Sequence, residues 1–283
     1  MTAVRDRLID TGYAAGWLLT RALPEPLALR LFTAIALRAE HRATGKGLRR
    51  NLARLVTPDH LDDTVRAALR SYARYWAETF RLPAQDPAAL RHRIHVTGVE
   101  HLDAARAAGR GVLLALTHSG NWDVAGLWLC AHAGRFTTVA ERLRPESLYR
   151  RFLAYRESLG FEILPLSGSA PPGRTLLKRL RANGIVCLLA DRVLTGASVP
   201  VTLFGEPARL PSGPAHLAVI TGAALVPAAT WFTDDGWGLR FHPALPVTDI
   251  AGTTQLLAEA FAADLAAHPA DWHMPHPVWT APR

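Results

Sequence analysis

The sequence predicts an α/β protein with a central, largely parallel sheet flanked by helices, preceded by an amphipathic helical N-terminal segment. Two observations carry this prediction. From about residue 92 onward, short apolar runs typical of buried strands alternate with helical patterns of about ten to fifteen residues. Before that point, apolar residues recur at helical spacing among many arginines.

The composition is that of a folded protein, with 49% hydrophobic and 20% charged residues in 283. We expect a single domain over residues 1–283, with a helical part at 1–90 and an α/β core at 91–283. Cys130 and Cys187 lie in apolar runs, as buried residues of a reducing compartment do. No stretch reaches the roughly 18 apolar residues of a membrane-spanning helix, and a secretory signal is not expected.

Residues 1–56 are predicted to form helices with cationic faces. Apolar and basic residues are interleaved there: Leu27, Arg30, Leu31, Ile35 and Arg38. Such segments lie well in a membrane interface, where anionic headgroups attract each arginine by about 1 kcal/mol. The alternative is an arginine-rich solvated face. The net charge of +8 fits an anionic membrane surface, whereas aromatics interleaved on a basic strand face, as in single-strand binders, are not seen, so no nucleic acid is expected.

A long helix is predicted to begin at Thr57-Pro58-Asp59, which combines a capping residue, a first-turn proline and an acid. Its apolar stripe recurs every three or four residues to about Leu82: Leu61, Val65, Leu69, Tyr72, Trp76 and Phe80. The aromatic end of this stripe is either core or the border of a groove for an apolar chain.

The remaining chain alternates between strands and helices. Strands are expected at 92–96, 112–116, 136–141, 161–166, 185–191, 201–204, 224–231 and 239–242, and helices at 100–108, 122–133, 145–159, 173–182, 212–221 and 253–267. Sites in such sheets lie beyond the carboxyl ends of the strands. His118, Glu141 and Asp191 each fall at the end of a predicted strand.

The clearest site pattern lies between residues 111 and 123. His118 follows a buried strand, and after a Ser-Gly-Asn turn Asp123 stands in the first turn of the next helix, with Asn121 as its N-cap. Across this turn Asp123 is able to hold one tautomer of His118 and stabilise its protonated form, which suits a general base. The alternative is that His118 caps the strand and Asp123 favours the helix N-terminus.

Three other positions have two interpretations each. Glu141 either hydrogen-bonds a polyhydroxylated acceptor or is a solvated carboxylate. Arg156, near a helix C-terminus, either binds phosphate or complements the helix dipole. Asp191, directly after a buried strand, is either a site residue or the partner of Arg192 in a salt bridge.

Motifs for other chemistries fail. Ser119 lies in Thr-His-Ser-Gly-Asn rather than G-x-S-x-G, so a hydrolase nucleophile elbow is not supported. His273 and His276 are three apart, but prolines break any helix there, so no metal site is expected. Neither G-x-x-x-x-G-K-[ST] nor G-x-G-x-x-G occurs, so nucleotide hydrolysis and dinucleotide redox chemistry lack their phosphate cradles.

His118-Ser-Gly-Asn-Trp-Asp123 is an H-x-x-x-x-D box after an apolar strand, and it resembles the glycerolipid acyltransferase superfamily. The Gly-Asn-Trp form is similar to the branch that contains bacterial lipid A late acyltransferases and phosphatidylinositol mannoside acyltransferases. The box aspartate and the Val-Ala-Glu-Arg-Leu segment favour the mannoside branch. Further stretches agree over roughly residues 45–280: Val139-Ala-Glu-Arg-Leu-Arg-Pro-Glu146, Arg156, Asp191-Arg192, Phe204-Gly-Glu206, Pro211-Ser-Gly-Pro214, Thr221-Gly222-Ala223 and Asp271-Trp-His-Met274.

The resemblance implies that His118 is the general base that takes a proton from a sugar hydroxyl. It implies that Asp123 orients His118 and that Asp191 positions the acceptor or the imidazole. Substrate contacts are expected from Asn121, Trp122, Glu141, Arg156 and Arg192, with backbone amides near Asn121 as donors to the tetrahedral oxyanion. Val193 stands where the family commonly has a second acid, so a role for that acid is absent here.

The resemblance further implies the partners. Acyl-CoA is the expected co-substrate, with a palmitoyl-like chain and no cofactor, and a mannosylated phosphoinositide is the expected acceptor. The protein is expected to be peripheral on the cytoplasmic face of the cell membrane. Two alternatives stay open: a lipid A-type or other glycerolipid acyltransferase that uses acyl-CoA or acyl carrier protein, and a non-catalytic basic membrane-binding protein.

Overall fold

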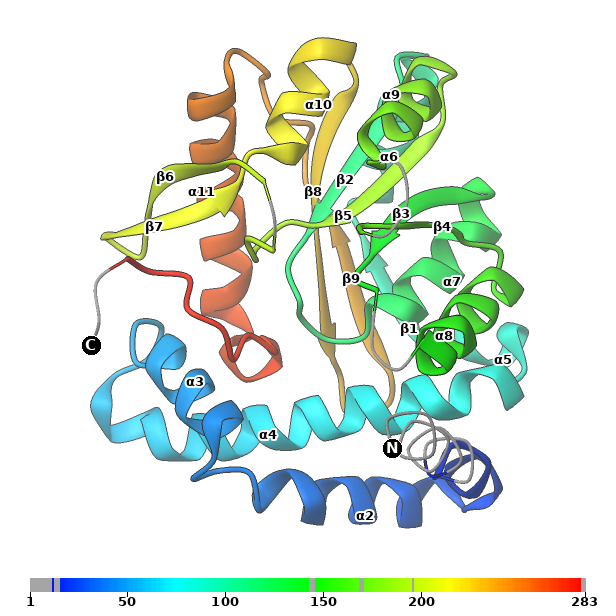
Figure 1. The fold of residues 1–283 in the computed structure, drawn as a ribbon, viewed down its shortest axis with the longest axis vertical. Helices are drawn as coiled ribbons and strands as arrows, with labels where there is room; N and C mark the ends of the chain where they lie inside the picture. Colours follow the sequence, from blue (N-terminus) through cyan, green and yellow to red (C-terminus); the bar gives the residue numbers. More distant parts are fainter. Residues whose placement is uncertain (1–11, 13–15, 143–145, 168–170, 195, 281–283) are drawn as a thin grey trace, which may run out of the picture.

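The structure is a computed structural model that describes residues 12, 16–142, 146–167, 171–194 and 196–280. The strands of its central sheet are β1 (Ile94–Thr97), β2 (Val112–Leu116), β3 (Phe136–Ala140), β4 (Glu162–Pro165), β5 (Ile185–Leu189), β8 (Ala224–Phe232) and β9 (Trp237–Phe241). These seven strands lie in the order β1-β9-β8-β2-β5-β3-β4 (Figure 1).

Five neighbouring strands of this sheet, from β8 to β4, are parallel. β9 runs antiparallel to β8 and carries β1 parallel to itself at the edge. The predicted α/β fold with a largely parallel central sheet is therefore confirmed. The carboxyl ends of β2, β3 and β5 meet at one edge, which is where a site in such a sheet is expected.

Both faces of the sheet are covered. One face packs against α5 (Pro87–Arg91), α6 (Val99–Ala107), α7 (Trp122–Ala133) and α8 (Glu146–Ser158). The other face packs against α9 (Gly173–Arg181), α10 (Gly213–Thr221), α11 (Ile250–Ala267) and an antiparallel pair, β6 (Ser198–Leu203) and β7 (Glu206–Pro211). β2 is consequently buried on both sides, because Leu114 belongs to the first core and Leu113 to the second. This double burial explains its uninterrupted apolar run.

The helices before the sheet are α2 (Glu25–Leu37), α3 (Ala43–Leu52) and α4 (Pro58–Arg81), which is followed by the short η1 (Leu82–Ala84). In Figure 1, α4 crosses the lower end of the sheet and α2 runs beneath it. Leu48 and Leu52 of α3 form a separate small core with Val65 and Leu69 of α4. The predicted helical N-terminal segment is therefore confirmed over residues 16–90, whereas residues 1–11 and 13–15, which the prediction also covered, lie outside the described residues. Among the described residues, no helix combines the length and the apolar character needed to cross a bilayer.

Some boundaries differ from the sequence expectation. β7 lies outside the predicted strands, because its prolines and charged residues break the apolar alternation, and its pairing with β6 forms it. α11 begins at Ile250 rather than 253, because Asp249 caps it by accepting a hydrogen bond from the Gly252 amide at 2.8 Å.

Candidate functional site

His118 and Asp191 meet at the carboxyl edge of the sheet. β2 and β5 are parallel neighbours, with Leu116 paired to Leu189. Because each site residue follows its strand partner by two positions, the register brings the two to the same height. Nδ1 of His118 lies 2.6 Å from Oδ1 of Asp191, and the backbone N–H of His118 donates to Oδ2 of Asp191 at 2.8 Å.

A third donor holds the same carboxylate. Nε1 of Trp272 donates to Oδ2 of Asp191 at 2.8 Å. Burial by itself would raise the pKa of Asp191, but the charge of His118 and the hydrogen bonds from His118 and Trp272 hold that pKa below its ordinary value. Asp191 is therefore an anion at neutral pH. Nδ1 of His118 donates to this anion, which leaves the Nε2 lone pair to accept a proton.

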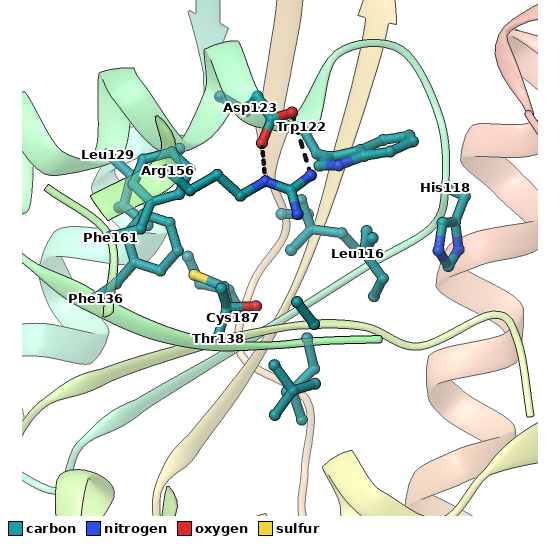
Figure 2. Close-up of a pocket in the computed structure, with 18 of the residues that line it drawn as sticks. Leu116, His118, Trp122, Asp123, Leu129, Phe136, Thr138, Arg156, Phe161 and Cys187 are labelled. Carbon is teal, nitrogen blue, oxygen red and sulfur yellow. Dashed lines mark hydrogen bonds and ion pairs between the residues drawn. The ribbon is translucent and has the colours of Figure 1, made fainter. Parts of the chain in front are cut away.

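The expected contact of Asp123 with the imidazole is wrong. Oδ1 of Asp123 accepts a hydrogen bond from Nε of Arg156 at 2.8 Å, and Oδ2 accepts one from a second guanidinium nitrogen at 3.3 Å (Figure 2). The hydroxyl of Tyr75 also donates to Oδ2, at 3.3 Å. The physical reason is that Asp123, 1% exposed, needs a cation within reach, and α8 supplies the guanidinium. The carboxylate that holds His118 comes from β5 instead.

Arg156 stays charged in this partly buried position. Burial opposes its charge, but Asp123 raises the pKa of Arg156 above its ordinary value. The guanidinium also lines the cavity described below. The ion pair with Asp123 is thus part of the cavity wall.

The turn of the box is held by α4. Asn121 is the N-cap of α7, as predicted, because its Oδ1 accepts from the Val124 amide at 3.2 Å. Its Nδ2 donates to Glu78 of α4 at 2.7 Å. Trp122 lies between this helix and the imidazole, with ring centroids 4.0 Å from Tyr75 and 5.5 Å from His118.

Glu141 and Arg192 face each other after β3 and β5. A guanidinium nitrogen of Arg192 lies 3.6 Å from Oε2 of Glu141. The salt bridge considered for Arg192 is therefore made with Glu141, while Asp191 is occupied by His118. The Glu141 side chain is 52% exposed and that of Arg192 27%, so both remain accessible to a polar ligand.

A cavity of about 230 Å³ adjoins the imidazole. His118 and Trp122 line one part of it, and Phe136 and Phe161 line the other in the view of Figure 2. Most of its lining is apolar: Leu114, Leu116, Leu129, Phe136, Phe161, Leu166, Cys187, Leu188, Leu189, Leu194, Leu239 and Phe241. A narrow apolar space beside a histidine base suits a hydrocarbon chain whose reacting end lies at the imidazole.

The structure brings all the predicted site residues to one region. Asn121 supports the box, Asp191 holds the imidazole, and six further residues line the cavity: His118, Trp122, Asp123, Glu141, Arg156 and Arg192. Sequence reasoning missed the functions of Glu78 and Trp272, which fasten the box from α4 and from the C-terminal segment. No sequence pattern pointed to Glu78, because its neighbours at helical spacing include the polar residues Ser71 and Arg74. Trp272 lies in the stretch Asp271-Trp-His-Met274, to which the sequence analysis assigned no role.

Comparison with known proteins finds relatives that match along nearly the whole chain. The chain is 54% identical over 281 residues to the phosphatidylinositol mannoside acyltransferase of Mycolicibacterium smegmatis (strain ATCC 700084 / mc(2)155), covering 97% of this chain and 92% of that protein. It is also 54% identical over 288 residues to proteins of the same name from Mycobacterium tuberculosis strains CDC 1551 / Oshkosh and ATCC 25618 / H37Rv, covering 99% of this chain and 91% of each.

The model of the family described as bacterial lipid A biosynthesis acyltransferase matches residues 4–281. The resemblance inferred from the H-x-x-x-x-D box is confirmed by this match and by the names of the relatives. The chain therefore belongs to the bacterial lipid A biosynthesis acyltransferase family.

Proposed function

We propose that this protein transfers a long, palmitoyl-like acyl chain from acyl-CoA to a mannose hydroxyl of a phosphatidylinositol mannoside, with His118 as the general base. The observation that carries the proposal is the position of the His118–Asp191 pair beside an apolar cavity. The acceptor class follows the names of the relatives at 54% identity.

The proton balance of the reaction rests on His118. Its Nε2 takes the hydroxyl proton as the sugar oxygen attacks the thioester carbonyl carbon, and Asp191 stabilises the imidazolium that forms. The tetrahedral oxyanion lies near the start of α7, where amides around Asn121 act as donors. When the C–S bond breaks, the imidazolium returns the proton to the leaving thiolate.

The acyl chain occupies the cavity in this proposal. Burying it against leucine and phenylalanine side chains stabilises the complex by about 0.8 kcal/mol for each methylene group. The Asp123–Arg156 pair interrupts the apolar wall near Trp122 with charge, and the two charges neutralise each other. The thioester carbon is thereby left beside His118.

The polar acceptor lies on the accessible side of the imidazole. Glu141 accepts hydrogen bonds from sugar hydroxyls, and Arg192 donates to sugar or phosphate oxygens. Their 3.6 Å separation leaves a weak contact that such a ligand is able to replace.

The protein docks to an anionic membrane, on its cytoplasmic face, and the surface of α2 supports the docking part of this proposal. Leu27, Leu31 and Ile35 are 48%, 43% and 56% exposed and follow one another at four-residue spacing. Arg30 and Arg38 are exposed on the same helix. An apolar stripe flanked by cations is the arrangement that lies in a headgroup interface.

The test compares the wild type with His118→Ala. Each protein receives palmitoyl-CoA and phosphatidylinositol dimannoside in mixed vesicles, and acylated product and free thiol are measured together. We expect turnover in the wild type and a loss on the order of 10³-fold or more in the variant. Equal rates from both proteins would exclude His118 as the base. Turnover only with lipid A-type acceptors, or only with acyl carrier protein as donor, would overturn the substrate assignment, and vesicle binding without turnover would indicate a non-catalytic protein.

A further inference from the structure

We propose that Trp272 is a positioning residue for the transfer reaction: its indole N–H fixes the carboxylate of Asp191, which in turn orients His118. This inference rests on the proposed function, in which His118 is the base. It concerns a residue that neither lines the cavity nor touches the imidazole ring directly.

The contacts of Asp191 show what Trp272 contributes. Oδ2 of Asp191 accepts two hydrogen bonds at 2.8 Å, one from the His118 backbone amide and one from the Trp272 indole. Two donors on one oxygen fix the rotation of the carboxylate, so Oδ1 is held 2.6 Å from Nδ1 of His118. Without the indole donor, the backbone amide of His118 would be the remaining one of these two donors to Oδ2.

Trp272 is itself held against the turn that carries His118. The residue before it, Asp271, accepts a hydrogen bond at its backbone oxygen from the Gly120 amide at 3.0 Å. The residue after it, His273, donates its backbone N–H to the His118 carbonyl at 2.7 Å. The imidazole-bearing turn and the indole are therefore parts of one hydrogen-bonded unit.

This unit is anchored to the rest of the fold through Asp271, at the end of η2 (Pro269–Asp271). Its Oδ1 accepts from the Ser71 hydroxyl of α4 at 2.6 Å, and its Oδ2 accepts from the Phe232 amide at the end of β8 at 2.9 Å. Trp272 is 1% exposed. The indole thus has one position available, and that position faces Asp191.

The test replaces the indole while keeping an aromatic ring, with Trp272→Phe. The chain offers a matched control in Trp279→Phe. Trp279 is also buried and packs edge-to-face against Trp272, with ring centroids 6.0 Å apart. Its indole N–H donates to the Leu203 carbonyl at 3.0 Å and not to Asp191. Both changes delete a buried indole donor, so a general loss of packing affects both variants.

For Trp272→Phe we expect kcat to fall about tenfold, as for the loss of a hydrogen bond to a charged group. KM for palmitoyl-CoA should stay within about twofold, because Trp272 is outside the cavity lining. The acid limb of the pH–rate profile should move to higher pH, because the hydrogen bond from Trp272 helps to hold the pKa of Asp191 below its ordinary value and its loss lets that pKa rise. Trp279→Phe should keep the wild-type kcat and profile.

A double-variant cycle separates positioning from packing. If the indole acts through the carboxylate, adding Trp272→Phe to Asp191→Asn causes no further loss of kcat. Additive losses, or identical profiles for Trp272→Phe and Trp279→Phe, would overturn the inference. A failure of the proposed function gives a different result. If His118 is not the base, His118→Ala retains the wild-type rate, and this result does not depend on the tryptophan variants.

Discussion

The carboxylate of Asp123 lies 2.8 Å from Nε of Arg156, inside the wall of the apolar cavity. The two residues of the H-x-x-x-x-D box therefore have different partners: the histidine binds Asp191 and the aspartate binds Arg156. Because its partner is Arg156, the box aspartate has a structural role in the cavity wall. The first prediction follows from it.

Asp123→Asn should destabilise the protein by roughly 3 kcal/mol, because it leaves the partly buried Arg156 guanidinium without its counter-charge. Urea unfolding measures this change. Asp62→Asn is the matched control, since it makes the same substitution in an exposed pair with Arg49 at 2.6 Å and should change the free energy of unfolding by less than about 1 kcal/mol. Equal effects of the two substitutions would contradict the structural role.

Asp191→Asn should lower kcat on the order of 10³-fold or more while the fold persists. The His118 amide and the Trp272 indole both donate to Oδ2, so the side-chain oxygen of the asparagine takes that position. Its NH₂ group then faces Nδ1 and imposes the tautomer that carries the proton on Nε2, which removes the base. Product formation from palmitoyl-CoA measures the loss, and a rate within tenfold of wild type would show that the carboxylate is dispensable.

Gly126→Ala should shift the donor preference toward chains shorter than palmitoyl. A Cβ at Gly126 would lie 2.5 Å from Cζ of Phe161 and 3.1 Å from Cζ of Phe136, so the cavity narrows between α7 and these rings. We expect kcat/KM to fall about fourfold for each methylene that no longer fits. Gly173→Ala is the control, because its Cβ meets no heavy atom within 4 Å. An unchanged chain-length profile in a folded Gly126→Ala protein would place the acyl chain elsewhere.

The free energy of unfolding should fall as the pH drops below about 6.5. Burial, with the nearby charge of His118, lowers the pKa of His273 from 6.5 to about 3. Between these values the unfolded chain binds a proton that the folded chain excludes, so acid favours unfolding by up to about 1.4 kcal/mol per pH unit. Urea unfolding from pH 7 to pH 4 tests this.

His273→Gln should flatten that pH dependence, because it removes the titrating group and keeps a donor for Ser71. His60→Gln, at an exposed position, should leave the slope unchanged. A wild-type slope in both variants would mean that other groups cause the acid sensitivity.

Local sequence patterns were sufficient to predict the fold class and the positions of several site residues. The apolar run of β2 is long because both of its faces are buried, and strand-end positions identified His118, Glu141 and Asp191 as neighbours. The helix start at Asn121 was also readable, since a cap acts on the amide three residues further along its own chain. Each of these features depends on chain neighbours or on the period of a strand or helix.

The sequence by itself determined the α/β class, the edge of the sheet at which the site lies, and the family to which the box belongs. Only the tertiary structure decided which carboxylate meets the imidazole. Asp123 and Asp191 both occupy positions at which local sequence predicts a site residue. The packing of α8 brings Arg156 to Asp123, and Asp191 pairs with His118. The tertiary structure also decided the place of Trp272, 81 residues from Asp191. Which side chains pair in this way depends on the distances between helices and strands, and the packing of the two hydrophobic cores sets those distances.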